Sequence, residues 1–428
     1  MPLKHMPRYC LFAAAIIFYL PVAAQNMTSP YSVYGIGIID FRSHNRASGM
    51  GHAGLALKYP NWLVTNNPAS LAALEKSWYI MDLAFTGNFV EYAGDPITIN
   101  NRSARDFGAR RGALAVKITN RWASSVGFRQ VSNVNYTYQG SVSTEGSPDK
   151  YAADYEGDGG LHTFYWTNAL SISKRLQAGF TMNLINGSVN RWERMEDINI
   201  SRVIETKVQD YYSGLHLEYG MLYSLPLHKQ WVLAIGGKLG QKTSLHPERT
   251  LTVLENGVAF VDEARVDAAG FQLPLSYGGG IALTHYNKQN RDNILTIAFD
   301  YNAERWKPLQ IRGSGWSMVN SQRFSGGVES ARYQRKQGRL LLRRLLQFGG
   351  FVNNSNLSVK SNQLTDAGIT VGFGSTISTI AGDLLYNLAL EVGQQGTTRD
   401  GLIKENYVRI TLGIGFRDFL YSKGRKYY

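Results

Sequence analysis

Strict alternation of apolar and polar residues, repeated in segment after segment, is the feature that most constrains this chain. One face of the stretch YVRITLGIGF carries the apolar residues Val408, Ile410, Leu412, Ile414 and Phe416. The same period of two recurs in AGFTMNL, LTIAFDY and LLYNLALEV. A soluble sheet can show this pattern over one strand. Its repetition from Trp78 onward indicates strands with one face in lipid and the other in a polar interior.

The connections between these strands alternate in length. Short turns are predicted at 119–123, 174–177, 225–230, 287–292, 335–339 and 378–382. Longer polar loops are predicted at 92–108, 139–160, 193–209, 245–269, 308–322, 354–366 and 394–404. Six short and seven long connections join fourteen strands, which predicts an all-β membrane protein, an antiparallel outer-membrane β-barrel with short periplasmic turns. The stretch RLLLRRLLQF leaves one alternative open, because it also fits a basic amphipathic helix.

The N-terminus has the features of a secretory signal peptide. Lys4, His5 and Arg8 precede the apolar run CLFAAAIIFYL, and Val22 and Ala24 supply the small residues before a cleavage site. We expect cleavage after Ala24 and a multi-pass barrel in the outer membrane of a Gram-negative bacterium. The single cysteine, Cys10, then leaves with the peptide, so neither a disulfide nor a thiolate metal site is expected.

The composition excludes a helical membrane protein and argues against a nucleic-acid partner. No apolar stretch of about twenty residues follows the signal peptide. Loss of Lys4 and Arg8 lowers the formal charge from +13 to +11, and in a secreted, strand-rich chain we expect these cations to meet outer-membrane lipid. Four tryptophans near predicted strand ends fit an interfacial girdle, although ordinary strand enrichment also explains them: Trp122, Trp166, Trp231 and Trp306.

A compact Gly- and Ala-rich segment precedes the first strand and contains GMGHAGLAL and NNPASLAAL. Asn67 suits the N-cap of a short helix and Pro68 its first position. These motifs resemble the N-terminal hatch of the FadL family of outer-membrane long-chain fatty acid transporters, through Gly49, Gly51, Ala53, Gly54, Asn67, Pro68, Ala69 and Leu71. LPLSYGGGIAL, NILTIAFDYNAERW and the last three strands are similar to strands of the same family.

The resemblance implies a fourteen-stranded barrel plugged by its hatch. We therefore divide the chain into a signal peptide (1–24), an N-terminal hatch or plug (25–77), a transmembrane barrel (78–418) and a basic periplasmic tail (419–428). Within the tail region, Arg417, Lys423, Arg425 and Lys426 fit either contact with inner-leaflet phospholipid or docking of a periplasmic partner.

Metal and catalytic motifs are weak. DYEGDGG, from Asp154 to Gly160, begins like a Ca²⁺ loop, but Tyr165 stands where the bidentate glutamate belongs, so a solvated acidic loop is the expectation. We find neither HExxH nor GxSxG, and no nucleophile is evident beside His162 or His246. No metal, no cofactor and no enzymatic activity are expected.

Polar residues on predicted inward positions are His216, Glu218, Asp300, Glu391 and Arg409. Arg409 is the candidate ligand anchor, and a salt bridge to Glu391 or to the hatch is its structural alternative. The leading hypothesis is an outer-membrane channel, similar to FadL, for hydrophobic or amphipathic small molecules. The alternative is a non-transport accessory subunit of an outer-membrane secretion or assembly complex, with a protein partner.

Overall fold

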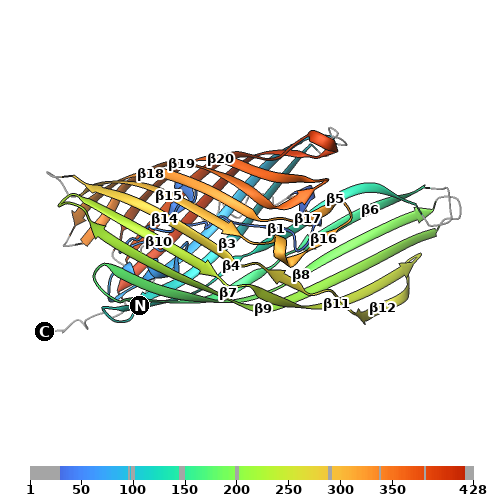
Figure 1. Ribbon diagram of the computed structural model, residues 1–428, viewed down its shortest axis with the longest axis horizontal. Coiled ribbons are helices and arrows are strands. Elements are labelled where there is room, and N and C mark those ends of the chain that lie inside the picture. Colours follow the sequence, from blue (N-terminus) through green and yellow to red (C-terminus); the bar gives the residue numbers. More distant parts are fainter. Residues whose placement is uncertain are drawn as a thin grey trace, which may run out of the picture.

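The computed structural model describes residues 29–94, 97, 102–143, 150–197, 202–287, 292–336, 339–379 and 382–419. Fourteen antiparallel strands close into a barrel, because the last strand pairs with the first from Trp78↔Phe419 to Ala93↔Lys404 (Figure 1). In ring order the strands are β2 (Trp78–Ala93), β3 (Ser103–Lys117), β4 (Trp122–Gln130), β7 (His162–Ser171), β8 (Leu176–Asp197), β9 (Arg202–Pro226), β10 (Trp231–Gly240), β14 (Ser276–Tyr286), β15 (Asn293–Glu304), β18 (Ser321–Lys336), β19 (Arg339–Val359), β20 (Asn362–Ser378), β21 (Asp383–Gly396) and β22 (Lys404–Phe419).

The predicted alternation is confirmed on the barrel wall. On β22, Val408 and Ile410 are exposed on the outside, whereas Tyr407 and Thr411 are buried on the inside. The alternative helix at RLLLRRLLQF is wrong, because this stretch lies in β19 and pairs with β18 and β20.

Three of the four tryptophans predicted for the girdle are exposed on the wall: Trp122, Trp166 and Trp231. The prediction for the fourth, Trp306, is wrong. Trp306 is only 1% exposed. Its indole Nε1 donates a hydrogen bond to Glu304 Oε2 at 2.6 Å. The chain turns inward after β15, so this ring packs in the interior instead of at the lipid surface.

All six predicted short turns fall between consecutive barrel strands, and the strand ends that flank them lie on the side of the barrel where the rings of Trp78 and Phe419 meet. We call this the turn end and the opposite one the loop end. Several predicted long loops are wrong, because they contain paired strands. Residues 139–160 lie largely in β5 (Ser132–Ser143) and β6 (Lys150–Gly159), 193–209 extend β8 and β9, and 245–269 form most of β11 (Thr243–Glu255) and β12 (Val258–Val266). These strands carry polar residues on a water-facing side, so the lipid-facing period used for prediction is lost.

These strands form a six-stranded antiparallel sheet that projects from the loop end, to the right in Figure 1. Its order is β5–β6–β8–β9–β11–β12, with residues 188–197 of β8 and 202–213 of β9 as the central pair. We call it the upper sheet. Shorter elements near its base are β13 (Phe271–Leu273), η5 (Lys307–Leu309), β16 (Arg312–Gly313) and β17 (Trp316–Met318). A turn of 3₁₀-helix, η6 (Arg399–Gly401), lies between β21 and β22.

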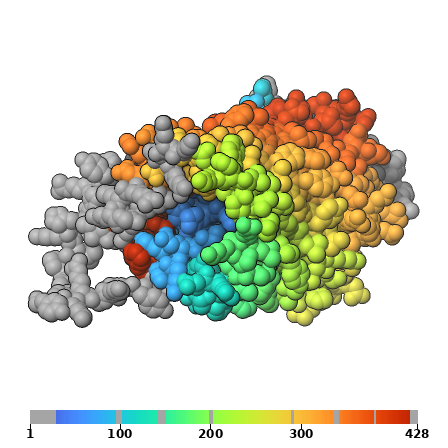
Figure 2. Space-filling model, turned by 60° about the vertical axis from the view of Figure 1, so that its left-hand side comes forward, coloured from blue at the N-terminus to red at the C-terminus, as the bar shows by residue number. Residues whose placement is uncertain are grey.

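The N-terminal segment, residues 29–77, has three 3₁₀-helices, η1 (Pro30–Val33), η2 (Arg46–Met50) and η3 (Pro68–Ala73), and a short strand β1 (Ile38–Ile39) that pairs with β5. Helix η2 contacts β18 to β21, whereas η3 contacts β4, β7, β8 and β9 on another part of the ring. Figure 2 shows this segment in blue, within the ring of strands. No helix among the described residues is long and apolar enough to cross a bilayer.

Candidate functional site

The candidate site is the contact between the N-terminal segment and the inward side chains of the barrel, which we call the lumen interface. The predicted cap at Asn67 is confirmed, because its Oδ1 accepts a hydrogen bond from Ala69 N at 3.0 Å. Asn67 Nδ2 also donates to the carbonyl oxygens of Leu55 (2.8 Å) and Met221 (2.9 Å). One side chain therefore joins η3, the preceding loop and the wall.

A buried ion pair links η2 to β18. Arg46 Nη2 lies 2.6 Å from Glu329 Oε1, and the two side chains are 0% and 1% exposed. Glu329 also accepts hydrogen bonds from Tyr59 at 3.0 Å and from Gln347 at 2.7 Å. The Arg46 guanidinium stacks 3.8 Å above the Tyr59 ring. A buried charge pair is stable only with partners of this kind. Separation of the segment from the wall would therefore leave Arg46 and Glu329 each without the opposite charge.

A second group of charges surrounds Arg42. Its guanidinium contacts Asp366 of β20 at 3.0 Å and Glu391 of β21 at 2.7 Å. Glu391 also contacts His52 Nε2 at 2.9 Å and Arg409 at 3.4 Å. One carboxylate of the wall thus holds two side chains of the N-terminal segment. The predicted anchor, Arg409, contacts this group, which matches its structural alternative.

Asp300 of β15 binds the segment through its backbone. Its Oδ2 accepts hydrogen bonds from the amides of Gly54 (2.6 Å) and Leu55 (2.9 Å). Close approach of the two backbones requires glycine on the wall. A Cβ at Gly327 would lie 2.6 Å from Met50 Cα, and one at Gly179 would lie 2.7 Å from the Pro68 carbonyl carbon. Glycine at these two wall positions therefore allows close contact with the segment.

Burial changes the protonation of two histidines of the segment. It lowers the pKa of His44 and of His52 below the usual value, although the carboxylates of Asp40 and Glu391 act in the opposite direction. Burial opposes ionisation of Asp40 too, but His44 and Arg42 hold the pKa of this carboxyl well below its usual value. Neutral forms of His44 and His52 and the ionised form of Asp40 therefore dominate near neutral pH.

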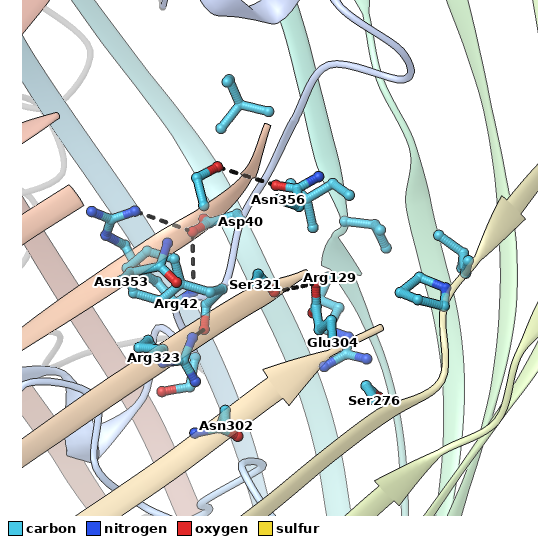
Figure 3. A pocket seen from close by; sticks show the side chains of 18 of the residues that line it. Asp40, Arg42, Arg129, Ser276, Asn302, Glu304, Ser321, Arg323, Asn353 and Asn356 are labelled. Carbon is cyan, nitrogen blue, oxygen red and sulfur yellow. Dashed lines mark hydrogen bonds and ion pairs between the residues drawn. The ribbon is translucent and has the colours of Figure 1, made fainter. Parts of the chain in front are cut away.

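A cavity of about 240 Å³, lined by both charged and apolar side chains, remains between the segment and the wall. In Figure 3, Asp40, Arg42 and Arg323 lie on one side of it, and Arg129 and Glu304 on another. His216, Glu218 and Lys238 also line it, and Glu218 lies 3.4 Å from Arg129 and 3.6 Å from Lys238. An apolar molecule placed here would remove water from charged groups, which is costly.

The other predicted residues take varied places. Gly49 and Gly51 pack against the wall, Gly54 donates its amide to Asp300 of the wall, and Leu71 is buried with Pro68 and Ala69 in η3. The acidic stretch at Asp154 is part of β6, not a loop; Asp154 and Asp158 accept hydrogen bonds from neighbouring strands. His162 begins β7 and His246 lies in β11. Among the described residues, no group of three His, Cys, Asp or Glu side chains could hold a metal ion.

Arg417 is not part of a free tail. It is buried, and its guanidinium contacts Asp383 at 2.8 Å and Glu75 at 3.2 Å. The tail residues Lys423, Arg425 and Lys426 and the signal peptide lie outside the described residues.

Sequence reasoning missed the cations of the segment, Arg42 and Arg46. Their signal is FRSHNR, in which two arginines and a histidine stand directly before the Gly- and Ala-rich motif, and the inward positions of the facing wall include Glu391.

Comparison with known proteins gives a family match over nearly the whole chain. The profile of a family described as BamG matches residues 6–427. A search of curated proteins gave no match.

Solved structures with a similar fold include a FadL homologue from Pseudomonas aeruginosa, at 11% identity and a TM-score of 0.55, covering 90% of this chain and 100% of that one. A deltaS2 mutant of the monoaromatic hydrocarbon channel TodX is 12% identical with a TM-score of 0.54, and the match covers 92% of this chain and 100% of that one. The toluene transporter TodX of Pseudomonas putida is 10% identical with a TM-score of 0.50, and the match covers 90% of this chain and 100% of that one. At these identities the likeness shows the fold, a FadL-like outer-membrane barrel.

Proposed function

The chain belongs to the BamG family, and from this premise we propose that it is a plugged barrel that serves as an accessory subunit of an outer-membrane secretion or assembly complex. The observation that carries this proposal is the lumen interface, where the N-terminal segment is held by buried ion pairs to several different strands. In this role the segment 25–77 is a permanent plug. The barrel supplies a fixed position in the membrane, and no catalysis is required.

The energetic cost of opening supports a permanent plug. Removal of the segment would separate Arg46 from Glu329 and Arg42 from Glu391, and would leave the Asp300 carboxylate without the Gly54 and Leu55 amides. These polar contacts would have to break together, and water would have to replace each of them in the opened lumen. Several such sites act together here. A gate that opens for each solute would require weaker contacts.

Orientation follows from the connections. In outer-membrane barrels short turns face the periplasm and longer connections face outward. We therefore place the turn end in the periplasm and the upper sheet outside the cell, after removal of the signal peptide near Ala24. Outer-membrane lipid contacts the exposed apolar side chains of the wall, such as Phe348 and Ile369.

A channel for hydrophobic or amphipathic molecules is the second candidate. The observation in its favour is the fold shared with TodX, a toluene transporter and monoaromatic hydrocarbon channel. In this role the N-terminal segment shifts to open a path, and Arg409 is the candidate anchor. The mixed charged and apolar lining of the cavity favours an amphipathic solute over a purely apolar one.

Two measurements on the wild-type chain distinguish the candidates. Gentle detergent extraction of native outer membranes, followed by purification through a tag on the chain, is expected to yield a stoichiometric complex. Uptake of a radiolabelled fatty acid or of toluene by cells is expected to be the same with and without the chain. A chain that purifies alone and whose removal abolishes uptake would contradict the accessory role and support the channel.

A further inference from the structure

The upper sheet extends well beyond the membrane. Strand β9 has 25 residues, whereas about 9–11 residues of a tilted strand cross a bilayer. Its outward face carries exposed Tyr219, Leu215 and Tyr211 and then becomes polar at Gln209 and Lys207. The membrane surface therefore lies near Tyr211, and the sheet beyond it stands in water.

The two faces of the upper sheet differ in chemistry. Strand register places one set of residues on the inner face, which continues the lumen-facing side of β8 and β9: Tyr138, Tyr155, Met195, Ile204, Leu251 and Val253. The outer face carries Gln139, Glu156, Arg194, Glu205, Thr250 and Thr252. The inner face also carries seven ionised side chains, but its apolar side chains outnumber those of the outer face, and such apolar area is stable in water when it is covered.

Among the residues that the structure describes, other parts of the chain pack only on the base of this inner face. There, Ile36 of the N-terminal segment, Trp306 and Met318 pack with Tyr136, Val189, Tyr212 and Leu245 in one buried cluster. Farther out, Tyr138 is 41% exposed, and Val258, which pairs with the inner-face residue Glu255 at the tip, is 71% exposed. The uncovered part is continuous with a packed core, so a partner seated on it would extend that core.

The charge of the inner face does not favour anionic lipid. Its described ionised residues are three arginines, Arg191, Arg202 and Arg249, and four carboxylates, Glu193, Asp197, Asp210 and Glu255, a net charge of −1. Asp210 is paired with both Arg191 (2.9 Å) and Arg249 (2.6 Å), and Arg202 with Glu255 (2.8 Å). A phosphate-bearing headgroup would meet no free excess of cations there.

A second copy in the same membrane does not fit either. Two sheets pack face to face at about 10 Å. Because the inner face looks over the mouth of its own barrel, a sheet from another copy at that distance would bring its barrel into the volume of the first. The occupant must therefore approach from the outside without a barrel directly beneath it.

The uncovered area suits a protein contact. Six strands about 4.8 Å apart and roughly eight residues of about 3.3 Å each give an area on the order of 600 Å². Each partner of a standard protein interface contributes roughly 800 Å². The tyrosines on this face, with Tyr138 and Tyr155 stacked at 4.8 Å, are typical of such interfaces.

We propose that the inner face of the upper sheet is the docking surface for a polypeptide at the cell surface, one that presents an apolar face and sits over the barrel mouth. This inference rests on the proposed accessory function and assigns its partner to the extracellular side. It predicts that the partner lies against β5, β6, β8, β9 and β11, and not against the membrane-facing wall or the periplasmic turns.

The test uses the full chain in its native outer membrane. A photo-crosslinking amino acid, benzoylphenylalanine, replaces Met195 on the inner face or Arg194 on the outer face of the same strand. We expect one polypeptide adduct of constant mass at position 195 and at least tenfold less at 194. Leu251→Asp, in the position-195 chain, is expected to reduce the adduct at least tenfold, whereas Thr250→Asp leaves it unchanged. Shifted gel migration on heating verifies that each barrel is folded.

The outcomes separate this inference from the accessory role. Absence of a polypeptide adduct at 195, an adduct with lipopolysaccharide, or one with the mass of two copies of this chain would each overturn the docking surface. If wild-type chain still purifies with a stoichiometric partner in those cases, the accessory function stands and the partner binds elsewhere. If the wild-type chain purifies alone, the accessory function fails as well. Equal adducts at 194 and 195, insensitive to Leu251→Asp, would also contradict the proposal.

Discussion

The lumen interface and the upper sheet are built partly from the same two strands, β8 and β9, yet they meet opposite needs. Inside the barrel, inward positions such as Thr181 and Glu218 are polar and contact other polar groups. Beyond the membrane, the same face of the same strands becomes apolar at Met195 and Ile204, and it is partly open.

The difference shows how the chain uses its own N-terminus. The wall carboxylates Glu329, Glu391 and Asp300 are stable because the N-terminal segment brings an opposite charge or a backbone amide to each of them. The apolar upper face receives Ile36 at its base only. The lumen interface is therefore complete within one chain, whereas the upper sheet requires a second one.

The largest effect is expected at the buried pair of the lumen interface. Arg46→Ala leaves Glu329 ionised and buried without its cation, which should cost about 3–5 kcal/mol of local stability. Hydrogen exchange of the amides of residues 45–57 should accelerate by a factor on the order of 10²–10³. Arg202→Ala in the exposed upper-sheet pair, with side chains 46% and 42% exposed, should cost about 0–1 kcal/mol.

The double variant Arg46→Met/Glu329→Leu sharpens this comparison. It removes both charges and keeps apolar volume, so most of the lost protection should return. Hydrogen exchange as fast as in Arg46→Ala would show that the loss of protection comes from packing around Tyr59 and not from the unpaired charge of Glu329.

Close contact of segment and wall gives the next effect. Gly327→Ala places a methyl group against the Met50 backbone, which should cost about 1–3 kcal/mol and expose the segment to protease. Gly279→Ala is the matched control, because nothing lies within 4 Å of its added Cβ. Equal protease sensitivity of the two variants would mean that the segment is not held against β18.

A smaller effect is expected for Asn67→Ala. The variant loses the cap of η3 and leaves the carbonyls of Leu55 and Met221 without this donor. Loss of one hydrogen bond with a buried partner costs about 1–3 kcal/mol, and nearby water can replace part of it. Exchange in residues 67–74 should rise while the barrel remains folded. Unchanged exchange there would assign the stability of η3 to Leu71 and its apolar contacts instead.

The smallest effect concerns pH. Burial holds the pKa of His52 below its unfolded value. The Glu391 carboxylate acts to raise this pKa, whereas the nearby Arg42 and His44 act to lower it. The released segment therefore binds a proton at a higher pH than the packed one, and stability falls as pH drops below about 6.5. Protease sensitivity should rise between pH 7.5 and pH 5, and His52→Gln should weaken this dependence more than His246→Gln on the upper sheet. An identical pH profile of protease sensitivity for both variants would show that His52 does not carry this pH dependence.

Much of the fold could be predicted, because lipid enforces a period of two on every strand that crosses it. YVRITLGIGF and the short turns gave correct strands and the fourteen-strand count. Asn67 and Pro68 predicted a helical cap from local chemistry alone. The upper sheet was not predicted, because a strand face in water need not be apolar and so shows no period of two. Asp154 and Asp158 on its outer face are residue types that are also typical of loops.

The partners in the lumen interface could not be predicted for another reason. Inward positions such as Glu391 were identified, but the residue that meets each one depends on the path of the N-terminal segment through the barrel. Arg42 and Glu391 are 349 positions apart in the sequence. No local pattern encodes that contact. The same limit applies to Trp306, whose burial follows from a turn of the chain after β15.

Conductance in a planar bilayer tests most directly whether the N-terminal segment is a permanent plug. Wild-type chain should be closed, Asn67→Ala nearly closed and Leu71→Asp leakier, because the last variant places an unpaired charge in the buried surface of η3. Deletion of 25–77 should give the largest pore. Equal conductance of the wild-type chain and the deletion variant, with both barrels folded, would contradict the account.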